Sequence, residues 1–308
     1  MAAESLNVQW IRGADPTDTP ELQRWAAAVG GAVIRQTSRP VERPTLEQLT
    51  SVSWNVHGTH GRILEFIKEL SATTKLAKRA VGPYVLMLQE AFRQDATIPR
   101  FVRGMRRAIR TPGTNPALPD IQQVAEQLDL SLIYVPSMRN GRGSEDRGNA
   151  ILSTLPVVDA YAFELPFRRE RRVAIAASVR VEVAGSSGLL RFINIHLDTW
   201  DSPRRLYLLS NPRPDQARCV LAQLDETLAT NFMVLGGDLN TFWPRERATQ
   251  AMLRQWATSQ GIEDETPTQG RHRIDYLFFR FASMHVGDTH VADSAFGSDH
   301  HPVIATFR

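Results

Sequence analysis

The sequence predicts an α/β protein in which sheets rich in antiparallel pairs are covered by helices on the outside. From Val173 to Val183 every second residue is apolar, which is the period of a half-buried strand. The turn GSSG at 185–188 leads into a second apolar run at 190–197, so the two runs predict a β-hairpin. Hairpins that alternate with helical segments favour antiparallel-rich sheets over a purely parallel, doubly wound sheet.

Short runs with strand or helix periodicity predict the elements before this hairpin. SVSWNV at 51–56 predicts a strand, and the apolar run YVLML at 84–88 predicts a strand buried on both faces. LIYV at 132–135 predicts another strand. Apolar residues at helical spacing predict helices around 63–70 and 121–128.

The elements after the hairpin are predicted in the same way. Val220, Leu221, Leu224 and Leu228 share one helical face, and a second helix is expected around 252–256. Strands are expected at 232–235, 274–279 and 303–307, where short apolar runs occur.

The first fifty residues differ from the rest of the chain. Thr19 followed by Pro20 is a cap with proline at the first helical position, and Gly30 ends the helix that follows. The polar, proline-containing stretch at 38–44 has the composition of a connector. We interpret residues 1–49 as an N-terminal extension with one helix, packed on a main domain at 50–308.

Composition excludes several classes of protein. The 308 residues are 42% apolar and 22% charged, which is unlike a disordered, collagenous or coiled-coil chain. The single cysteine, Cys219, excludes an intramolecular disulfide framework and a multi-cysteine zinc site. The N-terminus lacks a basic start followed by an apolar core, and no apolar run approaches the ~20 residues of a spanning helix, so we expect a cytoplasmic protein. No P-loop, GxSxG or HExxH motif occurs.

Polar side chains recur where the predicted strands end. One such residue is usually a turn former or a cap. Together they comprise only oxygen ligands and imidazoles, without thiols, and this set suits Mg²⁺ or Mn²⁺. The residues are Asn55, Glu90, Asn194, His196, Asp238, Asn240, Asp275, Asp299 and His300.

These nine residues lie in six of seven short motifs, and the seventh, GNAILS, contains Asn149. The motifs are SWNVHG at 53–58, LQE at 88–90, GNAILS at 148–153, NIHLD at 194–198, GGDLN at 236–240, RIDYLF at 273–278 and SDHHP at 298–302. In this order they resemble the endonuclease/exonuclease/phosphatase superfamily from Ser51 to Arg308. The resemblance implies a four-layer α/β sandwich, with two mixed, mostly antiparallel sheets packed face to face and helices on the outside.

The resemblance also implies a metal site and a charged pair. Glu90 would be the principal carboxylate ligand of Mg²⁺ or Mn²⁺, with Asn55 and Asp299 assisting. Asp275 and His300 resemble the carboxylate–imidazole pair of the family, in which the carboxylate holds the ring in one tautomer.

Four further residues carry roles by the same resemblance. Asp238 would orient or deprotonate the attacking water, and Asn240 would donate a hydrogen bond to a phosphate oxygen. His196 would stabilise the transition state or protonate the leaving group, and Asn149 would brace the centre. The division of acid and base between Asp238 and the two histidines stays open. His196-Leu197 is typical of the deoxyribonuclease I-like, deadenylase, sphingomyelinase and inositol-polyphosphate phosphatase branches, and it disfavours abasic-site repair.

Arginine supplies nearly all of the positive charge and it clusters. The chain has 36 basic residues, of which three are lysine, and a net charge of +3. Codon bias accounts for the number of arginines but not for their clustering. An ordinary solvated surface and a polyanion-facing rim are the two interpretations of the clusters. Candidate substrate-binding residues are Arg168, Arg171, Arg172 and Arg273. Further clusters are Arg100, Arg103, Arg106, Arg107 and Arg110, and then Arg139, Arg142 and Arg147.

Other histidines are weaker candidates. His57 and His60 have the spacing of an ordinary polar loop without a third ligand. His272, between Arg271 and Arg273, is an alternative substrate contact.

These observations lead to a metal-dependent phosphoesterase that hydrolyses a phosphodiester by in-line attack of water, with nucleic acid as the leading substrate. A phospholipid (sphingomyelinase-like) or inositol-phosphate headgroup is the alternative substrate, although no apolar membrane-docking hairpin is evident. A non-catalytic binding module with a relic site is the third interpretation, which the intact motif residues oppose. No protein partner is inferred.

Overall fold

The computed structural model describes most of the chain. The described residues are 6–11, 19–40, 43–72, 74–77, 79, 81–99, 118–139, 143–168, 170–183, 185–199, 211–243, 246–256, 266–281 and 286–307, without the side chains of 286–288. Several clustered arginines lie outside these residues, namely Arg100, Arg103, Arg106, Arg107, Arg110, Arg142 and Arg169.

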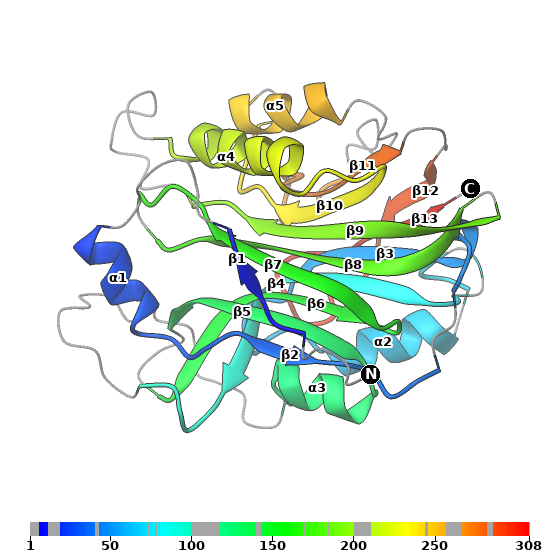
Figure 1. Cartoon of the computed structure of the whole chain (residues 1–308), viewed down its shortest axis with the longest axis horizontal. Helices are drawn as coiled ribbons and strands as arrows, with labels where there is room; N and C mark the ends of the chain where they lie inside the picture. The colour runs from blue at the N-terminus through cyan, green and yellow to red at the C-terminus, as the bar shows by residue number, and fades with distance from the viewer. Residues whose placement is uncertain are drawn as a thin grey trace.

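Two mixed sheets form the centre of the molecule (Figure 1). The six-stranded sheet has the order β1 (Gln9–Trp10), β7 (Val157–Glu164), β8 (Val173–Val183), β9 (Ser186–His196), β10 (Phe232–Asp238) and β11 (Asp275–Phe281). The seven-stranded sheet has the order β12 (Val286–Val291), β13 (Val303–Phe307), β3 (Thr50–Asn55), β4 (Tyr84–Gln94), β6 (Glu145–Ser153), β5 (Ser131–Arg139) and β2 (Val33–Arg35). The pairs β1·β7, β9·β10 and β3·β4 are parallel, and the other pairs are antiparallel.

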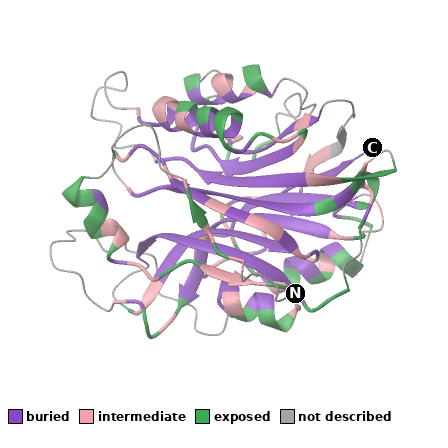
Figure 2. Cartoon of the chain, in the orientation of Figure 1, coloured by how far each residue is buried: buried purple, intermediate pink, exposed green. Residues whose placement is uncertain are grey.

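Helices cover the outer faces of both sheets, so the predicted four-layer sandwich is confirmed (Figure 1). The helices α2 (Ile63–Ala72) and α3 (Ile121–Gln127) pack on the seven-stranded sheet, and α4 (Arg213–Glu226) and α5 (Arg247–Gln255) pack on the six-stranded sheet. Three apolar cores separate the four layers. Figure 2 shows that the strands are buried along most of their length.

The strand β4 shows why a central strand is apolar at every position. Val85 and Met87 pack between the two sheets, whereas Leu86 and Leu88 pack against α2 and α3. Because successive side chains of a strand point to opposite faces, burial on both faces requires an uninterrupted apolar run. The run at 84–88 therefore predicted the strand correctly, and the strand continues to Gln94.

The sequence patterns predict the hairpin of β8 and β9, but they do not predict every other strand. β6, β7 and β12 were not predicted, although GNAILS within β6 was identified as a motif. β7 mixes buried and partly exposed residues without strict alternation. β7 is therefore a strand because it pairs with β8 and β1, and its own sequence pattern does not indicate a strand.

The N-terminal residues complete the edges of both sheets. Residues 9–10 pair with β7, and residues 33–35 pair with β5. Between them lies α1 (Pro20–Ala26), whose Leu22 N–H donates to the Oγ1 of the predicted cap Thr19 at 3.2 Å. The chain after α1 is held by Asp146, which accepts a 2.8 Å hydrogen bond from the Gly30 N–H. Within the described ranges no helix is long and apolar enough to cross a membrane.

Candidate active site

Three neighbouring strands place their polar ends side by side. Asp238, the last residue of β10, is directly opposite His196 of β9 and directly opposite Asp275 of β11. Residues paired across a sheet share a face, so the three side chains point to the same side. This register is what brings together three motifs that lie far apart in the sequence.

Two glycines let β10 approach its neighbours just before Asp238. A Cβ on Gly237 would lie 2.3 Å from the Ile195 carbonyl oxygen, and a Cβ on Gly236 would lie 2.8 Å from the Met87 Cε of the facing sheet. Both distances are far shorter than ordinary van der Waals contact. The two glycines of GGD are therefore required for β10 to pack this closely against β9 and against the facing sheet.

His300 forms an ion pair with Asp275. The Nδ1 of His300 lies 2.8 Å from the Oδ2 of Asp275, and both side chains are buried. Burial alone would lower the pKa of His300, but the carboxylates of Asp275, Asp238 and Asp299 raise that pKa to about 10. The imidazole of His300 is therefore cationic at neutral pH. Its Nε2 lies 2.9 Å from the amide nitrogen of Gln269 and 3.9 Å from the Oδ2 of Asp238.

Asp238 lies at the centre of the cluster. Its Oδ1 accepts a 2.8 Å hydrogen bond from the Asn240 N–H, and its Oδ2 accepts a 2.9 Å hydrogen bond from the Asn55 amide. Burial, followed by the charge of Asp275, raises the pKa of Asp238 to about 7, although His300 and Asn55 oppose the shift. A carboxylate whose pKa lies near neutrality can exchange a proton with a reactant under ordinary conditions.

His196 is the neutral counterpart of His300. Its Nδ1 lies 3.0 Å from the Nη1 of Arg172, and its Nε2 lies 3.5 Å from the Oδ2 of Asp238. Burial lowers the pKa of His196 well below its ordinary value. The positive charges of Arg172 and His300 lower it further. Within the described part of the chain, its buried Nε2 makes no hydrogen bond.

A β-bulge aims Glu90 at the space between the sheets. The register of β4 against β6 gains one residue between Leu88 and Ala91, and Glu90 has a φ of 54°. A regular strand would turn Glu90 to the helix-covered face of Leu88. Instead its Oε2 lies 2.6 Å from the Nη1 of Arg147, on the same face of β6 as Asn149. Burial opposes ionisation of Glu90, but Arg147 and Arg172 outweigh it and hold the pKa of Glu90 below its ordinary value.

The other two predicted metal ligands flank this centre. Asn55 ends β3, and its Oδ1 accepts a 3.0 Å hydrogen bond from the His57 N–H. The side chain of Asp299 is 49% exposed, and its Oδ1 lies 3.0 Å from the Nδ1 of His57. His57, interpreted from sequence as an ordinary loop residue, thus contacts a predicted ligand, and its ring lies 4.8 Å from that of His60.

The donor chemistry fits a divalent cation. Asp238 and Asp275 bring carboxylate oxygens within 4.8 Å of each other and of the His300 ring, which as a cation does not itself ligate a metal. The buried Oδ1 of Asp275 has no hydrogen-bond partner among the described residues. Carboxylate oxygens are the ligands that Mg²⁺ and Mn²⁺ prefer. Glu90 and Asp299 contribute further carboxylates, which here pair with Arg147 and His57.

The remaining predicted residues occupy different surroundings. Asn149 donates a 2.8 Å hydrogen bond to the Val173 carbonyl, so it ties the seven-stranded sheet to the six-stranded sheet. Asn240, with a φ of 51°, donates a 3.0 Å hydrogen bond to the Leu197 carbonyl. The guanidinium of Arg273 lies 5.4 Å from the centroid of the Tyr276 ring.

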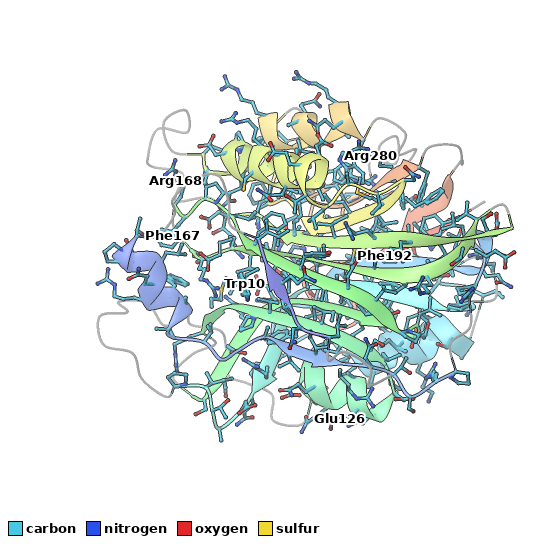
Figure 3. The ribbon with its side chains drawn as sticks, viewed as in Figure 1. Trp10, Glu126, Phe167, Arg168, Phe192 and Arg280 are labelled. Carbon is cyan, nitrogen blue, oxygen red and sulfur yellow. The ribbon has the colours of Figure 1, made fainter. Side chains whose placement is uncertain are left out.

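The predicted arginines before β8 do not act as a single group. Only Arg172 contacts a member of the cluster among the described arginines of this loop, through His196. Arg171 binds Glu164 at 2.8 Å and the Pro136 carbonyl at 2.9 Å, so its guanidinium is engaged in the fold. Arg168 has a side chain that is 59% exposed and lies 3.7 Å from Asp215 of α4, on the side of the molecule near α1 (Figure 3).

A buried arginine that sequence analysis missed braces the loop after β10. Arg213, the first residue of α4, donates to the Asn240 carbonyl and pairs with Glu246 at 2.9 Å. Glu246 in turn accepts a 2.9 Å hydrogen bond from the Phe242 N–H. No local signal distinguishes Arg213 from the many surface arginines, because its role depends on a loop that is distant in sequence.

Asn194 is another residue whose role emerges only in three dimensions. Its amide donates to the carbonyls of Leu88 and Ala150 at 2.8 Å each and accepts a 2.8 Å hydrogen bond from Gln89. Because all three partners belong to the other sheet, Asn194 joins the two sheets beneath the site.

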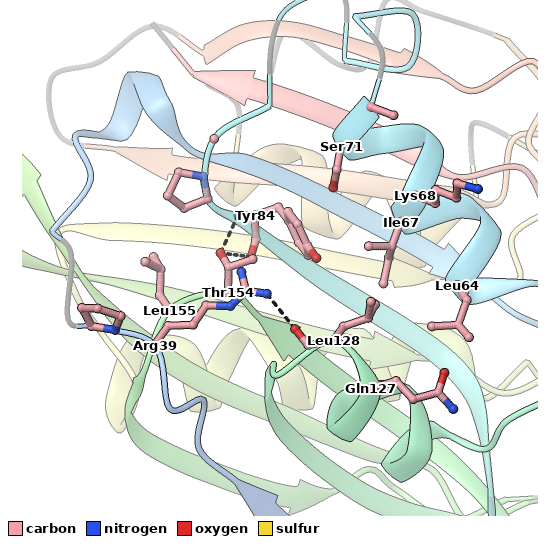
Figure 4. Close-up of a pocket in the computed structure, with 14 residues that line it drawn as sticks. Arg39, Leu64, Ile67, Lys68, Ser71, Tyr84, Gln127, Leu128, Thr154 and Leu155 are labelled. Atoms are coloured by element: carbon pink, nitrogen blue, oxygen red, sulfur yellow. Dashed lines mark hydrogen bonds between the residues drawn. The ribbon is translucent and has the colours of Figure 1, made fainter.

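A separate groove of about 1010 Å³ lies between α2 and α3 (Figure 4). Tyr84, which lines it, begins β4 six residues before Glu90, or about 20 Å along the strand. This groove therefore takes no part in the cluster described above.

The chain resembles known proteins in sequence pattern and in fold. Residues 52–300 match the model of the Endonuclease/Exonuclease/phosphatase family. No curated protein matches the chain in sequence.

Solved structures share the fold at low sequence identity. A protein of the same family from Beutenbergia cavernae is 22% identical, with a TM-score of 0.55 over 84% of this chain and 71% of the other. The catalytic domain of human Nocturnin with a bound sulfate anion is 18% identical, with a TM-score of 0.53 over 88% and 97% of the two chains. TDP2 of D. rerio, in complex with a single-strand DNA product, is 17% identical, with a TM-score of 0.51 over 84% and 98%.

Proposed function

The chain belongs to the endonuclease/exonuclease/phosphatase family, whose members are hydrolases of phosphoester bonds and generally depend on a divalent metal; we propose that this member hydrolyses phosphodiester bonds of nucleic acid by in-line attack of water. The observation that carries the proposal is the arrangement around Asp238, which has a cationic imidazole on one side and a neutral imidazole on the other.

The three central side chains have complementary proton states. Asp238 accepts a proton from the attacking water, because its pKa lies close to neutrality. His300, held cationic by Asp275, places positive charge against the phosphoryl oxygens. His196 donates its Nε2–H to an oxygen on which negative charge develops, because its Nδ1 is occupied by Arg172.

Glu90, Asn55 and Asp299 would hold Mg²⁺ or Mn²⁺. When bound, the cation neutralises charge on the phosphoryl and leaving oxygens. Asn240 donates a hydrogen bond to the phosphate, and Asn149 holds the two sheets at the spacing that the site needs. Arg172 acts through His196, whereas the exposed Arg168 attracts the polyanion at longer range.

Two further observations favour nucleic acid. Arginines cluster in the sequence at 100–110 and at 168–172, and arginine binds phosphate in a two-pronged geometry. The D. rerio structure of the same fold holds a single-strand DNA product. The fold by itself does not decide the substrate, which depends on the side chains of the site.

A panel of substrates tests the proposal. Purified protein is incubated with plasmid, single-stranded oligonucleotides, RNA, sphingomyelin vesicles and inositol phosphates, with Mg²⁺, with Mn²⁺ and with EDTA. We expect metal-dependent cleavage of nucleic acid that H300A abolishes and that E90Q weakens at low Mg²⁺, while the surface variant D225N, whose carboxylate binds Arg280, cleaves normally. Release of phosphocholine or inorganic phosphate without nucleic-acid cleavage would replace the proposed substrate.

A further inference from the structure

An exposed tryptophan follows the loop that carries Asn240. Trp243 is 56% exposed, and it and Trp10 are the two large apolar side chains that are exposed among the described residues. It lies three residues after Asn240, so the two Cα atoms are at most about 11 Å apart. A tryptophan side chain has a large apolar face, and the exposed part of this one is open to a ligand bound near Asn240.

Hydrogen bonds hold the described residues on both sides of Trp243 in place. The Trp243 carbonyl accepts a 2.9 Å hydrogen bond from the Glu246 N–H. The N–H of the preceding residue, Phe242, donates to the Glu246 side chain at 2.9 Å. Glu246 is itself fixed by the buried Arg213. Thr241 is also fixed, by a 2.7 Å hydrogen bond from Thr249 of α5. The ring therefore stands on a braced backbone and loses little freedom when it meets a ligand.

A second catalytic segment touches the same tryptophan. The His272 ring lies 6.1 Å from the Trp243 ring at 78°, and the Nδ1 of His272 lies 3.1 Å from the Phe242 carbonyl oxygen. His272 is three residues before Asp275, and in the same turn Gln269 lies 2.9 Å from the Nε2 of His300. Trp243 thus lies where the segment that carries Asp238 meets the segment that carries Asp275.

We propose that Trp243 is a stacking platform for an unpaired nucleobase next to the scissile phosphate, which makes single-stranded nucleic acid the preferred substrate. The inference rests on the proposed function and names its substrate class. An indole offers a flat surface that every base can stack on, whereas the bases of a duplex are already stacked on one another. The edge-on contact with His272 orients the indole and leaves more than half of the residue open to solvent.

The test pairs changes in Trp243 with changes in the substrate. Single-stranded oligonucleotides with one cleavable position are compared with copies that carry an abasic spacer on either side of that position, and with duplexes. Stacking of one base corresponds to roughly 5-fold to 150-fold in affinity. We expect W243A and W243L to raise KM for the normal strand within this range while kcat changes little, and W243F to restore most of the loss.

The abasic substrate separates stacking from a structural role. On the strand whose spacer replaces the stacked base, wild-type protein and W243A should have the same KM, because the interaction has already been removed. An equal loss on normal and abasic strands, or no loss on either, would overturn the inference while nucleic-acid cleavage itself stands. If the wild-type protein cleaves no oligonucleotide at all, the proposed function and this inference both fail.

Discussion

Arg172 donates a hydrogen bond to the Nδ1 of His196 across 3.0 Å, and this contact determines the tautomer of the ring. Because a guanidinium is only a donor, Nδ1 must accept, and the proton of the neutral imidazole lies on Nε2. Nε2 is the nitrogen that lies 3.5 Å from Asp238. The buried arginine therefore positions the hydrogen-bond donor of His196.

Replacement of Arg172 should therefore change the protonation of His196. In R172M the pKa of His196 rises, because burial still lowers it but the nearest positive charge is gone. We expect kcat to fall roughly 10-fold to 100-fold. This is the usual loss when a residue that orients an active-site side chain through a hydrogen bond is removed. Nitrogen chemical shifts of the histidine rings measure the tautomer and the pKa directly. R280M, at an exposed ion pair, is the matched control, and an unchanged His196 tautomer in R172M would contradict the assignment.

The pH profile should be bell-shaped and should respond to Asp275. Asp238 must be ionised to accept a proton, so kcat/KM rises through about pH 7, and His300 must be protonated, so kcat/KM falls through about pH 10. Asp275 raises both pKa values, so D275N should move both limbs to lower pH. Measurements of kcat/KM against pH at a fixed metal concentration test this expectation. A limb that moves to higher pH in D275N would show that Asp275 does not raise the pKa of that group.

Metal removal should abolish activity, and Glu90 should set the metal requirement. The carboxylate of Glu90 lies 2.6 Å from Arg147, so it is already ionised and aimed into the site. We expect E90Q to raise the Mg²⁺ concentration for half-maximal activity at least about 10-fold, because a neutral amide is a much weaker ligand for a hard cation. E226Q, a change at the exposed end of α4, should titrate like wild type. Activity that persists in EDTA would exclude the metal role.

Asn194 should matter for stability. N194A removes the two hydrogen bonds to the Leu88 and Ala150 carbonyls and the one from Gln89, at a cost of about 0.5–1.5 kcal/mol for each bond lost. We expect the free energy of unfolding to fall by about 3 kcal/mol, measured by urea denaturation at constant m-value. S187A, at an exposed position of the same strand, should change it by less than about 0.5 kcal/mol. A loss below about 1 kcal/mol in N194A would show that the two sheets do not depend on this bridge.

Local patterns predicted much of the fold. The alternation from Val173 to Val183 and the apolar run at 84–88 predicted their strands because period and burial are properties of the neighbouring residues. The same reasoning did not find β6, β7 and β12, whose order depends on pairing with strands elsewhere in the chain. Residues 9–10 and 33–35 were assigned to an extension, and the structure shows that they pair at the sheet edges.

The residue types and motif order by themselves determined the family, the four-layer sandwich and the candidate residues, because these are written in short, local segments. Only the tertiary structure decided how those residues act on one another. The register of β9, β10 and β11 puts His196 and Asp275 beside Asp238, and the bulge in β4 turns Glu90 toward Arg147. One histidine is cationic and the other neutral for the same reason, since His300 is buried against a carboxylate and His196 against an arginine. Such charge states depend on distances between segments that meet only when the sheets pack.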